Sequence, residues 1–250
     1  MNELLSSTAE SYVSHIDNCK KVFNCLFRLY KPTAMRLLDL ENAKEAEKFL
    51  ENMIVYHDLG KLTKAWQTRM RENRKKLPSH APIGAAFLFK VLPENLREPI
   101  SFAVCIHHTD SGLIGWNLEA PDAQAILDGL VDINGKIIWH DSVKNLDDEY
   151  FPEKVKSLNI EDLREMSVKL RTWARGNNLK TNHQRRIQGL FCHHILKLCD
   201  VFSARAREDF SNNKTSKMVE DIEKYVSSKF NLLNKNSECA KTLVKGVSNL

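Results

Sequence analysis

The stretch His57-Asp58-Leu59-Gly60-Lys61 decides the fold, because it places an imidazole and a carboxylate side by side at the end of an apolar helix. Apolar residues at helical spacing run from 43 to 54 directly into it, and Gly60 then offers a helix stop. Neither side chain belongs in a protein core unless it is paired or bound to a metal ion. A His-Asp pair is common by chance, so its meaning depends on the other histidines.

Five further polar residues lie on, or at the ends of, apolar helical patterns. These are His15 beside a stripe over 12–30, His80 before a helix over 81–92, His107 and His108 at the end of a helix over 96–108, and Asp200 inside a helix over 182–209. Each taken singly is typical of a hydrogen-bonded core residue, but seven together indicate one shared site. His107 and His108 can reach the same site only where their helix frays, since helical neighbours point about 100° apart.

Helical periodicity elsewhere predicts an all-α fold in a single domain over 1–250, with a core at about 10–210 and a C-terminal helix over 216–234. The helix over 182–209 is apolar around most of its axis, which predicts a central, buried position. Asn134-Gly135 between apolar residues predicts a small β-hairpin insertion over 131–139.

Composition is typical of a soluble globular protein, with 42% hydrophobic and 28% charged residues. Apolar runs are too short to span a bilayer and no signal peptide is evident, so we expect a cytoplasmic protein with no membrane contact. The six cysteines form no Cys-x-x-Cys pair and are expected to be reduced core residues. A net charge of +5 permits a nucleic-acid partner without requiring one.

Taken in their order along the chain, from His15 to Asp200, these histidine and aspartate motifs resemble the HD nuclease domain of type I CRISPR systems. The resemblance is to the form in which that domain is a separate polypeptide from its helicase. The resemblance covers about 10–210 and extends to Asp200, which has apolar flanks and Ser203 three residues later. Cys199 replaces the alanine usual before that aspartate, and residues 113–160 do not align. The resemblance implies a helical HD-domain bundle around a metal site.

The resemblance also implies roles for individual residues. His15, His57, Asp58 and Asp200 would hold one divalent cation, and Asp58 would bridge to a second held by His80, His107 and His108. Asp58 and Lys61 would be catalytic, with Lys61 at the scissile phosphate. Five imidazoles with two carboxylates suit Mn²⁺, Ni²⁺, Co²⁺ or Fe²⁺ better than Mg²⁺.

The implied activity is hydrolysis of single-stranded DNA in antiviral defence, as an endonuclease or an exonuclease. No Walker A motif is present, so a separate ATP-dependent helicase and a CRISPR target-recognition complex would present the strand. A basic segment could follow the DNA backbone; its candidate residues are Arg164, Lys169, Arg171, Arg175, Arg185 and Arg186. Trp66 and Trp173 either stack on bases or pack in the core.

Two alternatives remain open on the sequence. An HD phosphohydrolase acting on nucleotides or cyclic nucleotides would share His15, His57, Asp58 and Asp200, although His80, His107 and His108 favour a two-metal nuclease. A basic helical adaptor with a vestigial site would hold no metal. His193, seven residues before Asp200, either orients that carboxylate or is a plain core histidine.

Overall fold

The structure is a computed structural model that describes residues 3–108, 114–176 and 178–205, together with Ser228. The predicted C-terminal helix over 216–234 therefore lies outside the described residues, apart from Ser228. The longer helices are α1 (Tyr12–Leu38), α2 (Ala43–Tyr56), α3 (Lys64–Arg71), α4 (Ala81–Val91), α5 (Glu94–Cys105), α8 (Ile160–Arg175) and α9 (Leu179–Arg205). Shorter elements are α6 (Ile114–Glu119), α7 (Pro121–Leu127) and the 3₁₀ turns η1 (Leu59–Leu62), η3 (Asp141–Asn145) and η4 (Glu153–Ser157).

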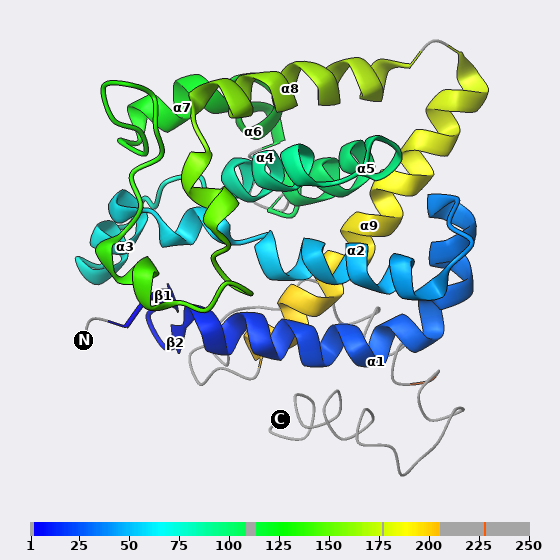
Figure 1. The fold of residues 1–250 in the computed structure, drawn as a ribbon, viewed down its shortest axis with the longest axis horizontal. Coiled ribbons are helices and arrows are strands. Elements are labelled where there is room, and N and C mark those ends of the chain that lie inside the picture. The colour runs from blue at the N-terminus through cyan, green and yellow to red at the C-terminus, as the bar shows by residue number, and fades with distance from the viewer. Residues whose placement is uncertain (1–2, 109–113, 177, 206–227, 229–250) are drawn as a thin grey trace.

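The helices pack in layers, as the sequence predicted for an all-α fold (Figure 1). α1 packs against α2 and α9, α4 pairs with α5, and α5 also contacts α9. α8 covers α4 and α5 on the side away from α1 (Figure 1). One apolar core joins these layers, and the ends of α2 and α5 meet the start of α1 beside it.

An antiparallel β-hairpin, β1 (Leu5–Ser7) and β2 (Glu10–Ser11), precedes α1 and was not predicted from the sequence. Ser11 caps α1 by accepting a hydrogen bond from the Ser14 amide. Gln67 holds the hairpin in place, because its side chain bonds the Leu5 amide at 3.1 Å and the Leu5 carbonyl at 2.8 Å. The same amide group donates to the Lys61 carbonyl at 2.8 Å, so the hairpin is tied directly to the turn after Asp58.

The segment over 131–139 forms a tight turn with an isolated antiparallel bridge between Val131 and Ile137, and this bridge does not extend into full strands. Gly135 adopts a φ of 76°, which explains the Asn-Gly sequence at the turn. The Asp132 side chain stabilises this turn, since its carboxylate accepts hydrogen bonds from the backbone amides of Asn134 and Lys136. The two-stranded sheet of the described residues, β1 with β2, lies near the N-terminus instead.

Two other expectations need correction. The first half of α9 is not buried on all sides, because Ile187 and Leu190 are 50% and 58% exposed, whereas the buried residues of this helix gather in its second half. Cys19, Cys105, Cys192 and Cys199 are free and buried as predicted, but Cys25 is disulfide-bonded.

Among the described helices, none is both long and apolar enough to cross a membrane.

Gly84 allows α4 to lie directly against the end of α2. A Cβ atom there would stand 2.3 Å from the Tyr56 carbonyl oxygen and 2.7 Å from that of His57. Both distances are too short for carbon against oxygen, so any larger residue forces the two helices apart.

We expect Gly84→Ala to lower the free energy of unfolding by about 1–3 kcal/mol, the usual cost of overpacking a core. Urea denaturation measures this cost. Lys48→Ala, on the exposed face of α2, is the control and should stay within about 0.5 kcal/mol of wild type. Equal stability of the two variants would contradict the close approach.

Candidate metal centre

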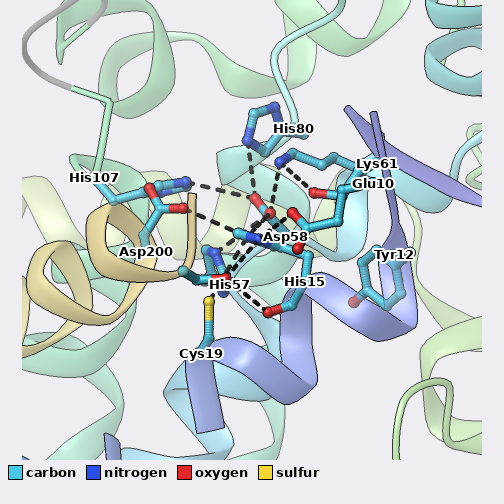
Figure 2. Close-up of polar contacts among 12 residues, drawn as sticks. Glu10, Tyr12, His15, Cys19, His57, Asp58, Lys61, His80, His107 and Asp200 are labelled. Atoms are coloured by element: carbon cyan, nitrogen blue, oxygen red, sulfur yellow. Dashed lines mark hydrogen bonds and ion pairs between the residues drawn. The ribbon is translucent and has the colours of Figure 1, made fainter. Parts of the chain in front are cut away.

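Asp58 lies at the centre of the predicted site, immediately after the C-cap of α2, with 1% of its surface exposed. Its Oδ2 is 3.3 Å from the Nε2 atoms of both His15 and His57. Its Oδ1 is 3.1 Å from His80 Nε2 and 3.7 Å from His107 Nε2. Figure 2 shows these side chains, from separate parts of the chain, pointing toward one carboxylate.

Backbone carbonyls set the orientation of two imidazoles. His57 Nδ1 donates to the Ile54 carbonyl at 2.7 Å, and His107 Nδ1 donates to the Val104 carbonyl at 2.6 Å. A carbonyl only accepts, so the proton sits on Nδ1 and the Nε2 lone pair points into the site. This is the arrangement of a metal-ligating histidine.

His108 reaches the site because α5 ends at Cys105, three residues earlier than the sequence predicted. His107 and His108 therefore occupy the turn after the helix, with ring centroids 3.9 Å apart. His108 Nε2 lies 2.8 Å from His80 Nε2. The 100° separation of neighbouring helical residues thus does not apply to this pair.

Asp200 approaches from α9, with its Oδ1 3.4 Å from His15 Nε2. Six of the seven residues predicted from the sequence meet in one place in Figure 2, and His108 joins them through its contact with His80. Among the described residues, two sets of donor atoms lie close together, and Asp200 belongs to neither. One set is Asp58, His80, His107 and His108, and the other is His15, His57 and Cys19.

Cys19 was not predicted as a site residue. It follows His15 by one helical turn, and its Sγ lies 3.7 Å from His15 Nε2. Burial raises the pKa of its thiol, which keeps the sulfur protonated in the metal-free protein. The spacing of four residues from a candidate ligand was the only signal available in the sequence.

Glu10 is the second residue that the sequence analysis missed. Its Oε2 lies 3.2 Å from His15 Nδ1, while its Oε1 accepts from Asn18 Nδ2 at 3.2 Å. Ser203 Oγ also lies 3.2 Å from the same imidazole nitrogen. A carboxylate on the far nitrogen of a histidine aims its other nitrogen and increases its basicity.

Lys61 lies on the open side of Asp58. Its Nζ is 2.7 Å from Asp58 Oδ2 and donates to Ser6 Oγ at 3.1 Å, so the N-terminal hairpin helps to hold it. The ammonium group also lies 5.8 Å from the centre of the Trp66 ring. Trp66 is 1% exposed, so it packs in the core and offers no face for a base to stack on.

The electrostatics favour neutral His57 and His80 beside an ionised Asp58. Burial lowers the pKa of His57 and of His80 to about 4. Burial opposes ionisation of Asp58, but His57 and Lys61 outweigh it and hold the pKa of that carboxyl well below its usual range. Neutral histidine and ionised aspartate are the forms that bind metal.

The predicted basic segment lies elsewhere in the fold. Most of it is on α8, which packs on α4 and α5 away from α1 (Figure 1). Arg164 pairs with Asp122 at 2.9 Å and with Glu161 at 2.7 Å, and Arg185 donates to the Trp173 carbonyl at 2.9 Å. Lys169, Arg171, Arg175 and Arg186 are exposed. The structure does not bring these residues to Asp58.

The donor atoms themselves test whether this site suits a metal ion. Within the part of the chain that the structure describes, His57 Nε2, His107 Nε2 and both Asp58 oxygens are buried without a hydrogen-bond partner. The contact from Lys61 to Asp58 is close but not aligned as a hydrogen bond. Each buried polar atom left unbonded costs about 1–3 kcal/mol, and divalent cations held by these residues would satisfy all four.

A helical fold with a buried His-Asp centre of this kind defines the HD class of metal-dependent hydrolases. The family described as the Cas3 HD domain matches residues 6–245, so this chain belongs to that family. The resemblance stated from the sequence is therefore confirmed, and with it the binding of divalent metal as the coarse property of the class.

Two curated relatives are each named CRISPR-associated endonuclease Cas3-HD. The one from Methanocaldococcus jannaschii is 26% identical over 247 residues, covering 90% of this chain and 97% of its own. The one from Pyrococcus furiosus is 25% identical over 211 residues, covering 78% and 88%. The solved structure of the CRISPR-associated Cas3 HD domain protein from M. jannaschii gives a TM-score of 0.58 at 20% identity, over 80% of this chain and 100% of that one. The last comparison supports the fold alone.

We expect the metal-free protein to lose stability as the pH falls from 6.5 to about 4. His57 and His80 have pKa values of about 4 when folded and near 6.5 when unfolded, so unfolding takes up protons across this window. Each contributes about 1.4 kcal/mol per unit of pKa difference. His15, whose pKa is raised by its neighbours Cys19, Asp200 and Asp58 despite burial, titrates above the window.

Urea denaturation in a chelator, repeated along this pH range, measures the loss. His80→Gln removes one of the titrating groups and should therefore show a smaller decline than wild type. A free energy of unfolding that stays constant between pH 6.5 and 4 would contradict the burial of neutral imidazoles.

We expect Glu10→Ala to weaken the binding of Mn²⁺ by about 10–100-fold, the usual effect of removing a carboxylate behind a ligating histidine. Glu10→Gln should weaken it less, because an amide of the same shape keeps a polar oxygen beside His15 Nδ1 although it carries no charge. Titration calorimetry gives the affinities, with Glu45→Ala on the surface of α2 as the control. Wild-type affinity in a folded Glu10→Ala protein would show that Glu10 plays no part in aiming His15.

Proposed function

We propose that this chain is a metal-dependent nuclease that hydrolyses phosphodiester bonds of single-stranded DNA in CRISPR antiviral defence. The relatives named as endonucleases support it, as does the family match. The observation that carries it is the buried Asp58, both of whose oxygens lack a hydrogen-bond partner in the described part of the chain, as do the Nε2 atoms of His57 and His107 that face it. Asp58 also lies next to Lys61, which lines a cleft. Cleavage within a strand follows from the relatives' names, and cleavage from an end is a matter for experiment.

In this proposal, His15, His57, Asp58 and Asp200 hold one divalent cation. Asp58 would also be a ligand of a second divalent cation, and His80, His107 and His108 would be its other ligands. Five imidazoles among seven ligands favour Mn²⁺, Ni²⁺, Co²⁺ or Fe²⁺ over Mg²⁺, which prefers oxygen donors. Cys19 lies close enough to the first group of ligands to adjust that preference toward softer metals.

The chain's own residues prepare the site for a phosphodiester. Bound divalent cations supply a water of lowered pKa and positive charge at the phosphate. Asp58 stays ionised, and His57 and His80 stay neutral, so that these two imidazoles have lone pairs to donate at neutral pH. Lys61 adds a fixed positive charge on the open side of Asp58, where negative charge grows as the bond breaks.

A separate helicase and a CRISPR target-recognition complex complete the proposal, with the cytoplasm as the place of action. They would deliver the strand, since the chain has no Walker A motif with which to unwind DNA by itself. The exposed basic side chains of α8 and the start of α9 are candidate contacts to the DNA backbone. They are Arg164, Lys169, Arg171, Arg175, Arg185 and Arg186.

We expect the purified protein to cleave a labelled single strand with Mn²⁺ or Ni²⁺ and without ATP. Asp58→Ala should reduce cleavage to background, because it removes the ligand shared by both cations. Lys61→Ala should lower kcat by about 10²–10³-fold while metal still binds, since one stabilising charge is lost. Gel electrophoresis with a panel of metals measures both effects.

Asp148→Ala, at an exposed carboxylate, is the matched control for Asp58→Ala and should cleave like wild type. The same panel includes deoxynucleoside triphosphates and cyclic dinucleotides, the substrates of the alternative HD phosphohydrolase. Turnover of those nucleotides without cleavage of the strand would favour that alternative. Full activity of Asp58→Ala would end the assignment of Asp58.

A further inference from the structure

A cleft of about 870 Å³ opens beside the metal centre. Lys61, His80 and His108 form its inner end, whereas His15, His57 and His107 are completely enclosed. A substrate in the cleft can therefore reach the centre at His80 and His108, whereas Asp200, whose side chain is 16% exposed, does not line the cleft. The cleft runs outward from there between the α3–α4 connection and the helices α6 and α7.

The outer part of the cleft is basic. Lys75 and Lys76, consecutive in the α3–α4 connection, both line it, and both are exposed. In the described part of the chain, neither side chain has a carboxylate partner. Together with Lys61 they place three lysines along one side of the route to the centre.

Asp128 is the only acid among the described lining residues, and its charge is already balanced. Its carboxylate accepts from the Ser79 amide at 3.2 Å and from Gln124 Nε2 at 2.9 Å, and Arg69 Nη1 lies 3.5 Å away. Only 5% of Asp128 is exposed. The potential in the outer part of the cleft is consequently positive, because Lys75 and Lys76 are not opposed, whereas Lys61 is paired with Asp58 at its inner end.

The connection that carries the lysines is fixed to the body of the protein. Besides the bond from its amide to Asp128, Ser79 donates through Oγ to Asn117 Oδ1 at 2.6 Å. Asn117 in turn donates to the Cys105 carbonyl at 2.9 Å, at the end of α5 just before His107. This chain of hydrogen bonds fixes Ser79, three residues after Lys76, relative to the end of α5.

We propose that this cleft binds the part of the DNA strand next to the scissile phosphate. Lys75 and Lys76 bind two further phosphates of the same backbone. The inference rests on the proposed function and adds where the strand lies. A row of lysines leading to a cation-binding centre suits a polyanion with regularly spaced charges better than a single nucleotide. Leu127, 74% exposed on the opposite side of the cleft, gives the bases or sugars an apolar surface.

The cleft and α8 are rival routes for the strand, and three double variants with the same loss of charge separate them. These are Lys75→Ala with Lys76→Ala in the cleft, Arg171→Ala with Arg175→Ala on α8, and Lys44→Ala with Lys48→Ala on α2 as the control. Each is assayed with Mn²⁺ on a labelled oligothymidine strand over a series of salt concentrations. Hydrolysis of bis(p-nitrophenyl) phosphate, which has a single phosphate and no further backbone phosphates for Lys75 and Lys76 to bind, reports on the centre.

We expect the cleft variant to raise KM for the strand and to reduce the slope of log KM against log salt by about 1.4, or about 0.7 for each phosphate that a lysine no longer neutralises. Its kcat/KM for the small diester should match wild type, and the α2 control should match wild type on both substrates. A salt slope in the cleft variant equal to that of the α2 control would overturn the inference. So would a slope that falls only in the α8 variant.

Different experimental outcomes would contradict the proposed nuclease function and the proposed location of the strand. If the wild-type protein cleaves neither the strand nor the small diester with any metal, the nuclease assignment is lost. The salt dependence of strand binding, measured by fluorescence anisotropy, then makes the same comparison between the three variants. If the wild type cleaves but the cleft variant is unaffected, only the location of the strand is wrong.

Discussion

The buried carboxylate of Asp58 is the constraint on which the rest of the structure depends. An ionised aspartate with 1% of its surface exposed is unfavourable unless charge or hydrogen bonds compensate for the lost water. Here the compensation comes from imidazoles on separate elements and from Lys61, with cations proposed to complete it. The helices have to end where they do because each must deliver a side chain to this one point.

Helix ends, and not helix interiors, build most of the centre. α2 ends at Tyr56, so His57 and Asp58 follow it at once, and α5 ends at Cys105, so that His107 and His108 leave the helical geometry together. The carbonyls of the last helical turns then become useful, because those of Ile54 and Val104 fix the tautomers of two histidines. Gly84 lets α4 approach closely enough to bring His80 into range.

The N-terminal hairpin gives the centre its outer support. It contributes Glu10 behind His15 and Ser6 beside Lys61, and Gln67 ties it to the backbone of that same lysine. The contacts of Ser6 with Lys61 and of Leu5 with Gln67 join residues more than 50 positions apart in the chain. The hairpin therefore couples the entrance of the site to its buried end, although it is only a few residues long.

The sequence by itself determined the helical class and the seven residues of the centre. Apolar periodicity reports burial along a helix, and a histidine or aspartate within it reports a buried polar group in need of a partner. Only the tertiary structure decided the roles of Glu10 and Cys19, the exposed half of α9 and the separation of α8 from Asp58. Those facts depend on contacts between distant segments, which have no periodic signal in the chain, and on where each helix ends, which is set by packing against its neighbours.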